Sequence, residues 1–139
     1  MKQIILSILA VVAMSFATKA QVQNLTIQNN TGCTVAYLLT SMSNPNCTGS
    51  VSNSSILTVA PGGTVNHTSG NYYIIVDIYN IPPCSGSTYS RVGEVYECGG
   101  TTQYNSSGAL LDAVNCNACG TVNINWTSTG PNSAIVSIN

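Results

Sequence analysis

The stretch 72-YYIIVDIYNI-81 decides the fold class, because it carries the strongest strand pattern in the chain. Alternate side chains starting at Tyr72 point to one face of a strand, and those starting at Tyr73 point to the other. Both faces are largely apolar, and alternation blurs in this way when a strand is covered on both sides. We therefore expect residues 72–81 to form a central strand of an all-β protein.

The carboxyl-terminal region shows clear alternation between apolar and polar residues. Val122, Ile124 and Trp126 are separated by polar residues, which predicts one apolar face and one polar face. Residues 129–132 form a predicted turn, and residues 134–138 return as the last strand. We expect a terminal hairpin with Trp126 in the core.

The amino-terminal half contains shorter apolar runs separated by residues that favour turns. Residues 22–28 and 33–40 flank the sequence Asn29-Asn30-Thr31-Gly32, and this order predicts a hairpin. A second hairpin is predicted from residues 56–59 and 64–68, which flank Ala60-Pro61-Gly62-Gly63.

Weaker patterns complete the list of expected strands. Residues 89–98 resume the strand pattern, residues 101–104 repeat it weakly, and residues 109–114 fit a strand or a short helical turn. No stretch of ten or more residues has helical periodicity with caps. The sequence therefore predicts one domain, residues 21–139, folded as a disulfide-stabilised antiparallel β-sandwich of about eight to ten short strands.

Six cysteines lie in that predicted domain, and an even number in an exported protein is typical of a disulfide framework. They are Cys33, Cys47, Cys84, Cys98, Cys116 and Cys119. Two pairs share one spacing, and this favours the pairings Cys33–Cys47 and Cys84–Cys98 as staples of local hairpins. Cys116 and Cys119 would then bond to each other or bind a metal ion.

Two rival interpretations concern the motif Cys116-Asn117-Ala118-Cys119. Zinc sites often begin with such a pair, here joined by Cys84 and Cys98, but a four-cysteine site usually shows two close pairs. A redox role would require a βαβ pattern around the motif, which the sequence lacks. We therefore expect disulfides, with no metal ion and no cofactor.

The segment 25-LTIQNNTGCTVAYLL-39 resembles the opening hairpin of thaumatin-like proteins. An apolar strand, an Asn-containing turn, a cysteine and a second apolar strand occur in that order. The family is longer and richer in cysteine, and its acidic cleft has no counterpart in this sequence. The resemblance covers fifteen residues, so it implies a β-hairpin and carries no function.

The amino terminus has the pattern of a cleavable secretory signal. Lys2 supplies the positive charge, residues 4–17 are apolar, and Thr18-Lys19-Ala20 offers a cleavage site. The apolar run is shorter than the roughly 20 residues of a membrane span. The first cysteine, Cys33, is too far downstream for a lipid anchor. We expect residues 1–20 to be a signal peptide, and the mature protein to be secreted or periplasmic.

Removal of that segment leaves very little charge. Arg91 becomes the only basic side chain, against four acidic ones, so the net charge of residues 21–139 is about −3. A protein with a single basic side chain cannot neutralise a phosphate backbone, which excludes nucleic acid as a partner. The abundance of Ser, Thr and Asn predicts a neutral surface rich in hydroxyl and amide groups.

Residues for catalysis are scarce. His67 is the only histidine and could be combined with Asp77 and a serine, but no serine has the context of a catalytic nucleophile. Glu94 and Glu97 lie three residues apart on one predicted strand, so they point to opposite faces and cannot flank one glycosidic bond. We expect a protein that is not an enzyme.

Aromatic side chains are the best candidates for a binding role. Tyr73 and Tyr79 share a predicted face with Asp77, and tyrosine rings can stack on sugars while neutral polar groups supply hydrogen bonds. Our first hypothesis is therefore an exported protein that binds a neutral glycan or another protein at the cell surface. A structural subunit that assembles through its terminal strands is second, and a small secreted hydrolase is third.

Overall fold

The computed structural model describes residues 22–45, 48–80, 84, 87–93 and 102–139. Within these ranges 65% of the residues lie in strands, none lies in a helix, and the strands form two sheets. The predicted signal peptide lies outside the described residues. The strands in the described part are β1 (Asn24–Asn29), β2 (Val35–Met42), β3 (Val51–Asn53), β4 (Leu57–Val59), β5 (Thr64–Thr68), β6 (Tyr72–Asn80), β7 (Ser87–Gly93), β8 (Asn105–Leu111), β9 (Ala118–Gly130) and β10 (Ser133–Ile138).

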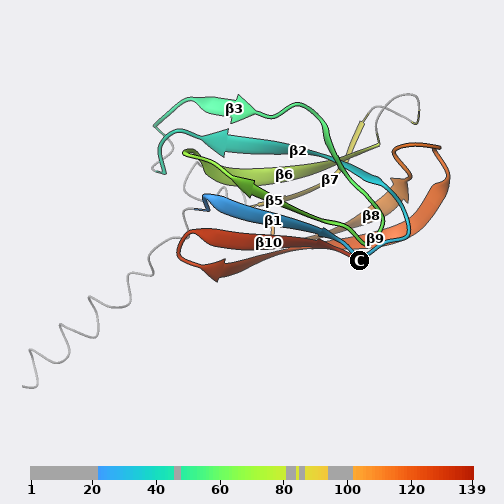
Figure 1. Cartoon of the computed structure of the whole chain (residues 1–139). Coiled ribbons are helices and arrows are strands. Elements are labelled where there is room, and N and C mark those ends of the chain that lie inside the picture. The colour runs from blue at the N-terminus through green and yellow to red at the C-terminus, as the bar shows by residue number, and fades with distance from the viewer. Residues whose placement is uncertain (1–21, 46–47, 81–83, 85–86, 94–101) are drawn as a thin grey trace, which may run out of the picture.

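The first sheet has the strand order β5-β1-β10-β9-β8, and the second has the order β3-β2-β6-β7 with β4 also paired to β2. Figure 1 shows the second sheet with β3 and β2 uppermost, and β1 and β10 of the first sheet below them. Both sheets contribute side chains to one hydrophobic core, including Tyr37 and Val76 from the second sheet and Trp126 and Val136 from the first. Trp126 is 3% exposed, which confirms its predicted core position.

The prediction of a central strand at residues 72–81 is confirmed over residues 72–80 by β6, which pairs with β2 on one side and with β7 on the other, and Ile81 lies outside the described residues. A β-bulge modifies the predicted faces, because Thr40 lies opposite Ile75 whereas Ser41 lies opposite Tyr73. Ile74 is the extra residue, and Tyr73 therefore shares the inward face with Val76. The alternation of apolar residues in the sequence does not reveal a bulge of this kind.

The two predicted amino-terminal hairpins are wrong. β1 and β5 belong to the first sheet, whereas β2 and β4 belong to the second, so each predicted turn is a crossing between sheets. The Asn29 side chain fixes the first crossing, because its Nδ2 donates to the carbonyl oxygens of Cys33 (2.7 Å) and Ala60 (2.9 Å). Turn-forming residues favour a reversal of the chain, but they do not determine whether the next strand joins the same sheet.

The carboxyl-terminal hairpin is confirmed, since β9 and β10 pair in antiparallel register. The expectation of a purely antiparallel arrangement is wrong at one place, because β1 and β10 are parallel. A parallel pair needs a long connection, and between β1 and β10 the chain passes to the second sheet and back twice. The ambiguous residues 109–114 divide between the end of β8 and a turn that begins at Asp112.

The two sheets approach each other where β7 and β8 run past one another. Gly93 and Gln103 exchange two backbone hydrogen bonds, of 2.9 and 3.0 Å. The hydroxyl groups of Ser90 and Ser106 are also hydrogen-bonded to each other. Glycine is required at position 93, because a Cβ atom there would overlap the carbonyl oxygen of Ile74.

The predicted disulfide pairings are wrong. Cys33 bonds to Cys119, with 6.1 Å between their Cα atoms, and Cys84 bonds to Cys116, with 5.0 Å. The remaining predicted partners, Cys47 and Cys98, lie outside the described residues. The equal sequence spacing favoured disulfides within local hairpins. Cys33 instead lies where the chain crosses between the sheets, and it therefore bonds to a cysteine of β9, which is distant in the sequence.

Candidate functional site

The three predicted ligand-contact residues of β6 do not lie together. Asp77 and Tyr79 point to the outer face of the second sheet, on the side opposite Val76 and Ile78 of the core. Tyr73 points inward because of the bulge and packs against the core. The structure thus separates Tyr73 from the other two.

Asp77 forms an ion pair with Arg91 across the β6–β7 pair, where the two residues lie directly opposite each other. Arg91 Nε donates to Asp77 Oδ1 at 2.6 Å, and Arg91 Nη2 donates to Asp77 Oδ2 at 3.0 Å. The Asp77 side chain is 4% exposed, whereas that of Arg91 is 56% exposed. This two-point contact fixes the plane of the guanidinium group and leaves it facing solvent.

Arg91 stays charged in this ion pair, and the carboxylate of Asp77 balances its charge. The hydrogen bonds to Asp77 raise the pKa of Arg91 above its ordinary value. An arginine carries five N–H groups. The two hydrogen bonds to Asp77 use two of them, and the side chain is 56% exposed, so the group can also donate to oxygen atoms of a ligand.

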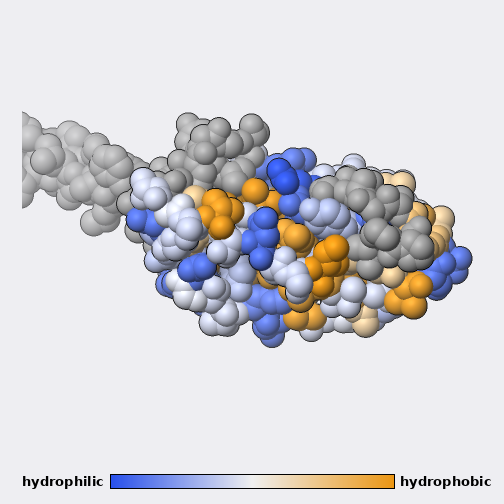
Figure 2. Space-filling view, turned by 90° about the horizontal axis from the view of Figure 1, so that it is seen from above, coloured by the Kyte–Doolittle hydropathy of each residue, from blue (hydrophilic) through white to orange (hydrophobic). Residues whose placement is uncertain are grey.

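Other residues on the same face give it a mixed apolar and polar character. We call the outer side of β2, β3 and β6 with Arg91 the Tyr79 face, after one of its members. By strand register, its members are Ala36, Leu38, Thr40, Met42, Val51, Asn53, Tyr72, Ile75, Asp77, Tyr79 and Arg91. Ala36, Thr40, Met42 and Asp77 are buried among them, and the others are partly or fully exposed. Figure 2 shows apolar side chains among hydrophilic ones on the side of the molecule that carries β3 and β2.

The ligand contacts predicted from the sequence did not include Arg91 or Tyr72 of this face. Arg91 was identified only by its charge, because its position opposite Asp77 depends on the register between β6 and β7. Tyr72 was assigned to the opposite face from Tyr79, and the bulge at Ile74 brings the two onto the same face. The signals in the sequence were the charge of Arg91 and, for Tyr72, the aromatic content of β6.

A second polar cluster lies between the two sheets. The hydroxyl group of Tyr37 and Nε2 of His67 are 2.8 Å apart, and Tyr73 makes an edge contact with the same imidazole ring. Burial raises the pKa of Tyr37 to about 12. Burial also lowers the pKa of His67. At neutral pH both groups are therefore uncharged, with a single hydrogen bond between them.

The hypothetical hydrolase arrangement is not assembled. His67 contacts Tyr37 at the inner side of the sheets, whereas Asp77 lies on the outer face and is bonded to Arg91. Tyr37 is 1% exposed and takes the position next to His67 that a nucleophile would need. The other acidic candidates, Glu94 and Glu97, lie outside the described residues.

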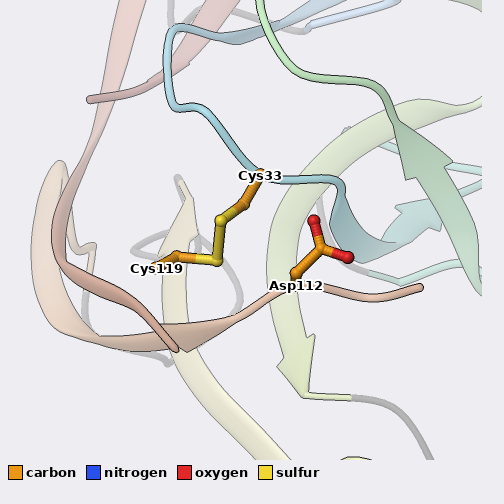
Figure 3. A group of neighbouring side chains, drawn as sticks. All are labelled: Cys33, Asp112 and Cys119. Carbon is orange, nitrogen blue, oxygen red and sulfur yellow. A yellow bond between two sulfur atoms is a disulfide. The ribbon is translucent and has the colours of Figure 1, made fainter. Parts of the chain in front are cut away.

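The disulfide end of the molecule, which comprises the two disulfides and Asp112, contains the one metal-like grouping found among the described residues. Potential donor atoms of Cys33, Cys119 and Asp112 lie within 4.8 Å of one another (Figure 3). The two sulfur atoms are bonded to each other at 2.05 Å. The grouping is therefore a disulfide beside a carboxylate, and it lacks the thiolate ligands that a zinc site needs.

Asp112 holds the backbone of this end in place. Its Oδ2 accepts from the N–H of Thr34 at 2.7 Å, and its Oδ1 accepts from Val114 (2.9 Å) and Asn115 (3.1 Å). The hydrogen bond from Thr34 is the largest cause of a pKa below the ordinary value for this carboxyl group. Because Thr34 precedes β2 and Asp112 follows β8, the carboxylate links the two sheets.

Comparison with known proteins finds no matching family profile, no matching curated protein and no matching solved structure for this chain. In the described part of the chain no helix has the length and apolar character needed to cross a bilayer. The two disulfides indicate an oxidising environment, outside the cell or in a periplasm.

Proposed function

We propose that this protein is an exported, non-enzymatic β-sandwich that binds a neutral glycan through the Tyr79 face. In this proposal residues 1–20 direct export and are removed. Residues 21–139 are the working domain, and its disulfides keep it folded in an oxidising environment.

The observation that carries the proposal is the fixed guanidinium group of Arg91 beside Tyr79. Asp77 orients Arg91 with two hydrogen bonds, and Tyr79 lies two residues along β6 on the same face. A tyrosine ring offers an apolar surface to the C–H groups of a sugar ring. An oriented arginine next to it donates hydrogen bonds to the sugar hydroxyl groups.

The charge balance favours a neutral glycan over an acidic one. Asp77 neutralises Arg91, and residues 21–139 contain no other basic side chain. An acidic polysaccharide would meet a domain with a net charge of about −3 and would be repelled. A neutral chain of hydroxyl groups meets no such penalty.

The proposal is tested by retention of the purified protein on insoluble cellulose and chitin. We expect wild type to bind one of them, and Tyr79→Ala to lower the affinity roughly tenfold, which corresponds to about 1.4 kcal/mol. Tyr104→Ala is the matched control, because Tyr104 is 48% exposed and lies outside the Tyr79 face. Absence of retention on both polymers, or equal retention of Tyr79→Ala and wild type, would contradict the proposal.

The alternative of a structural subunit that assembles through its terminal strands receives no support from the topology. β1 is paired with β5 and β10, and β10 is paired with β1 and β9. Neither terminal strand therefore offers an open edge to a neighbouring subunit.

A further inference from the structure

We infer that the ligand of the Tyr79 face is an extended, linear polysaccharide chain that lies along β6, with Tyr72 and Tyr79 as two separate stacking platforms. This inference rests on the proposed function and specifies its ligand class. It assigns to Tyr72 a binding role equal in kind to that of Tyr79.

The register of β2 and β6 places the two tyrosines on one face. Met42 lies opposite Tyr72, and Ala36 lies opposite Tyr79. Met42 and Ala36 are both even-numbered residues of β2, a strand without a bulge of its own in this pairing, so they share a face. Their partners Tyr72 and Tyr79 therefore share it too, and both are partly exposed.

The distance between the two platforms requires a ligand of several sugar units. Their partners Met42 and Ala36 are six residues apart on β2, and this separation corresponds to about 20 Å along the strand. A monosaccharide can contact one ring only. A chain that contacts both must be extended, because the two rings lie about 20 Å apart along the strand.

The surface between Tyr72 and Tyr79 offers apolar contacts and hydrogen-bond donors, which match the C–H groups and the hydroxyl groups of a sugar chain. Leu38 and Ile75 are partly exposed and offer apolar contacts in the middle of the track. Thr40 donates its hydroxyl proton to Oδ1 of Asn53 at 3.0 Å, which orients the side-chain amide of the exposed Asn53. The amide N–H groups of Asn53 lie on the β3 side, and the guanidinium of Arg91 lies on the β7 side.

The bulge at Ile74 is what creates this track. Without it, strict alternation would place Tyr73 beside Tyr79 on the outer face and would turn Tyr72 inward. With it, Tyr73 packs against the core and contacts His67, while Tyr72 is available to a ligand. Two adjacent tyrosines thus have different roles, one between the sheets and one on the surface.

The experiment measures affinity for soluble cello-oligosaccharides and chito-oligosaccharides of one to six units by isothermal titration calorimetry. We expect the affinity of wild type to rise with chain length until both platforms are occupied. Tyr72→Ala should lower the affinity for the hexasaccharide roughly tenfold. The same substitution should leave the affinity for the disaccharide unchanged. Tyr104→Ala is again the control, and circular dichroism confirms that each variant is folded.

The outcomes separate this inference from the proposed function. Binding that depends on Tyr79, with equal affinity for one and six units or with no effect of Tyr72→Ala, overturns the linear-chain inference and leaves glycan binding intact. Failure of wild type to bind any of the oligosaccharides or the two insoluble polymers overturns both.

Discussion

Two buried aspartates show how differently the same side chain is used in the two regions of this molecule. Asp112, 7% exposed, belongs to the disulfide end, and Asp77, 2% exposed, belongs to the Tyr79 face. The oxygen atoms of Asp112 accept from backbone N–H groups, whereas those of Asp77 accept from the side chain of Arg91. The first carboxylate fixes the chain, and the second fixes a group that still faces solvent.

We propose that this difference separates residues that maintain the fold from residues that bind the glycan. Backbone groups held by Asp112 have no capacity left for a ligand, and two disulfides reinforce the same end. Among the described residues, Arg91 donates two hydrogen bonds, both to Asp77, and its side chain is 56% exposed. Substitutions at the disulfide end should therefore change stability without affecting binding, and substitutions on the Tyr79 face should change binding more than stability.

The largest expected effect on stability comes from removing the Cys33–Cys119 disulfide. Its partners are 86 residues apart, so the double variant Cys33→Ser with Cys119→Ser should lose about 4 kcal/mol of unfolding free energy. Urea unfolding measures the loss. Removal of Cys84–Cys116, with a separation of 32, should cost roughly 1 kcal/mol less. No loss in the first variant would show that the disulfide end does not maintain the fold.

Asp112→Asn should have the next largest effect, because an amide nitrogen replaces one acceptor of the backbone hydrogen bonds. The folded pKa of Asp112 lies below its ordinary value of 3.8, so its contribution is fully present above that pH and is lost as the pH falls below it. Thermal unfolding of wild type and variant between pH 2 and pH 7 measures this. The two should differ most near neutral pH and converge in acid, and a difference that is independent of pH would contradict the account.

Arg91→Ala should lower the unfolding free energy by about 1–2 kcal/mol, because it leaves the buried Asp77 carboxylate without its charged partner. Arg91→Lys restores a charge but not the two-point contact, so it should recover part of the stability and little of the glycan affinity. Chemical unfolding and the retention assay are run on both variants. Equal glycan affinity for lysine and arginine at this position would exclude an oriented guanidinium group as the binding element.

His67 should produce a smaller, pH-dependent effect between the sheets. Its folded pKa lies below the ordinary value of 6.5, so stability is complete above that pH and declines as the pH falls from about 6.5 towards the folded pKa. His67→Gln should remove this slope from thermal unfolding curves measured between pH 4 and pH 8. A slope that persists in the variant would assign it to another group.

Tyr79→Ala should have the smallest effect on stability, within about 0.5 kcal/mol, because it replaces a partly exposed side chain at the surface. Its effect on glycan retention should nevertheless be the clearest. Thermal unfolding of Tyr79→Ala and of the control Tyr104→Ala tests this. A large loss of stability in the first alone would make Tyr79 a structural residue.

Much of the architecture could be predicted from the sequence. Alternation located β6, β9 and β10 and placed Trp126 in the core, because burial on a strand selects apolar side chains at every second position. The pairings of β1 and β2 could not be predicted, since Asn29 directs a crossing between sheets through contacts with residues distant in the sequence. The Cys33–Cys119 disulfide depended on the same crossing.

The candidate site was predicted only in part, for a related reason. Asp77 and Tyr79 were identified because two residues on one strand share a face whenever an even step separates them. Arg91 required the register between strands, and Tyr72 and Tyr73 exchanged faces at a bulge. Such register shifts are set by packing across the sheet, so the sequence of one strand does not reveal them.

The most direct test of the account compares Asp77→Asn with Asp112→Asn in two assays, thermal unfolding and retention on cellulose and chitin. Both substitutions replace a buried carboxylate with an amide of the same shape. We predict that Asp77→Asn loses most of its retention with a small change in the unfolding midpoint, and that Asp112→Asn keeps its retention with a much lower midpoint. If Asp77→Asn is retained like wild type, or if both variants lose retention in proportion to stability, the Tyr79 face is not the binding site.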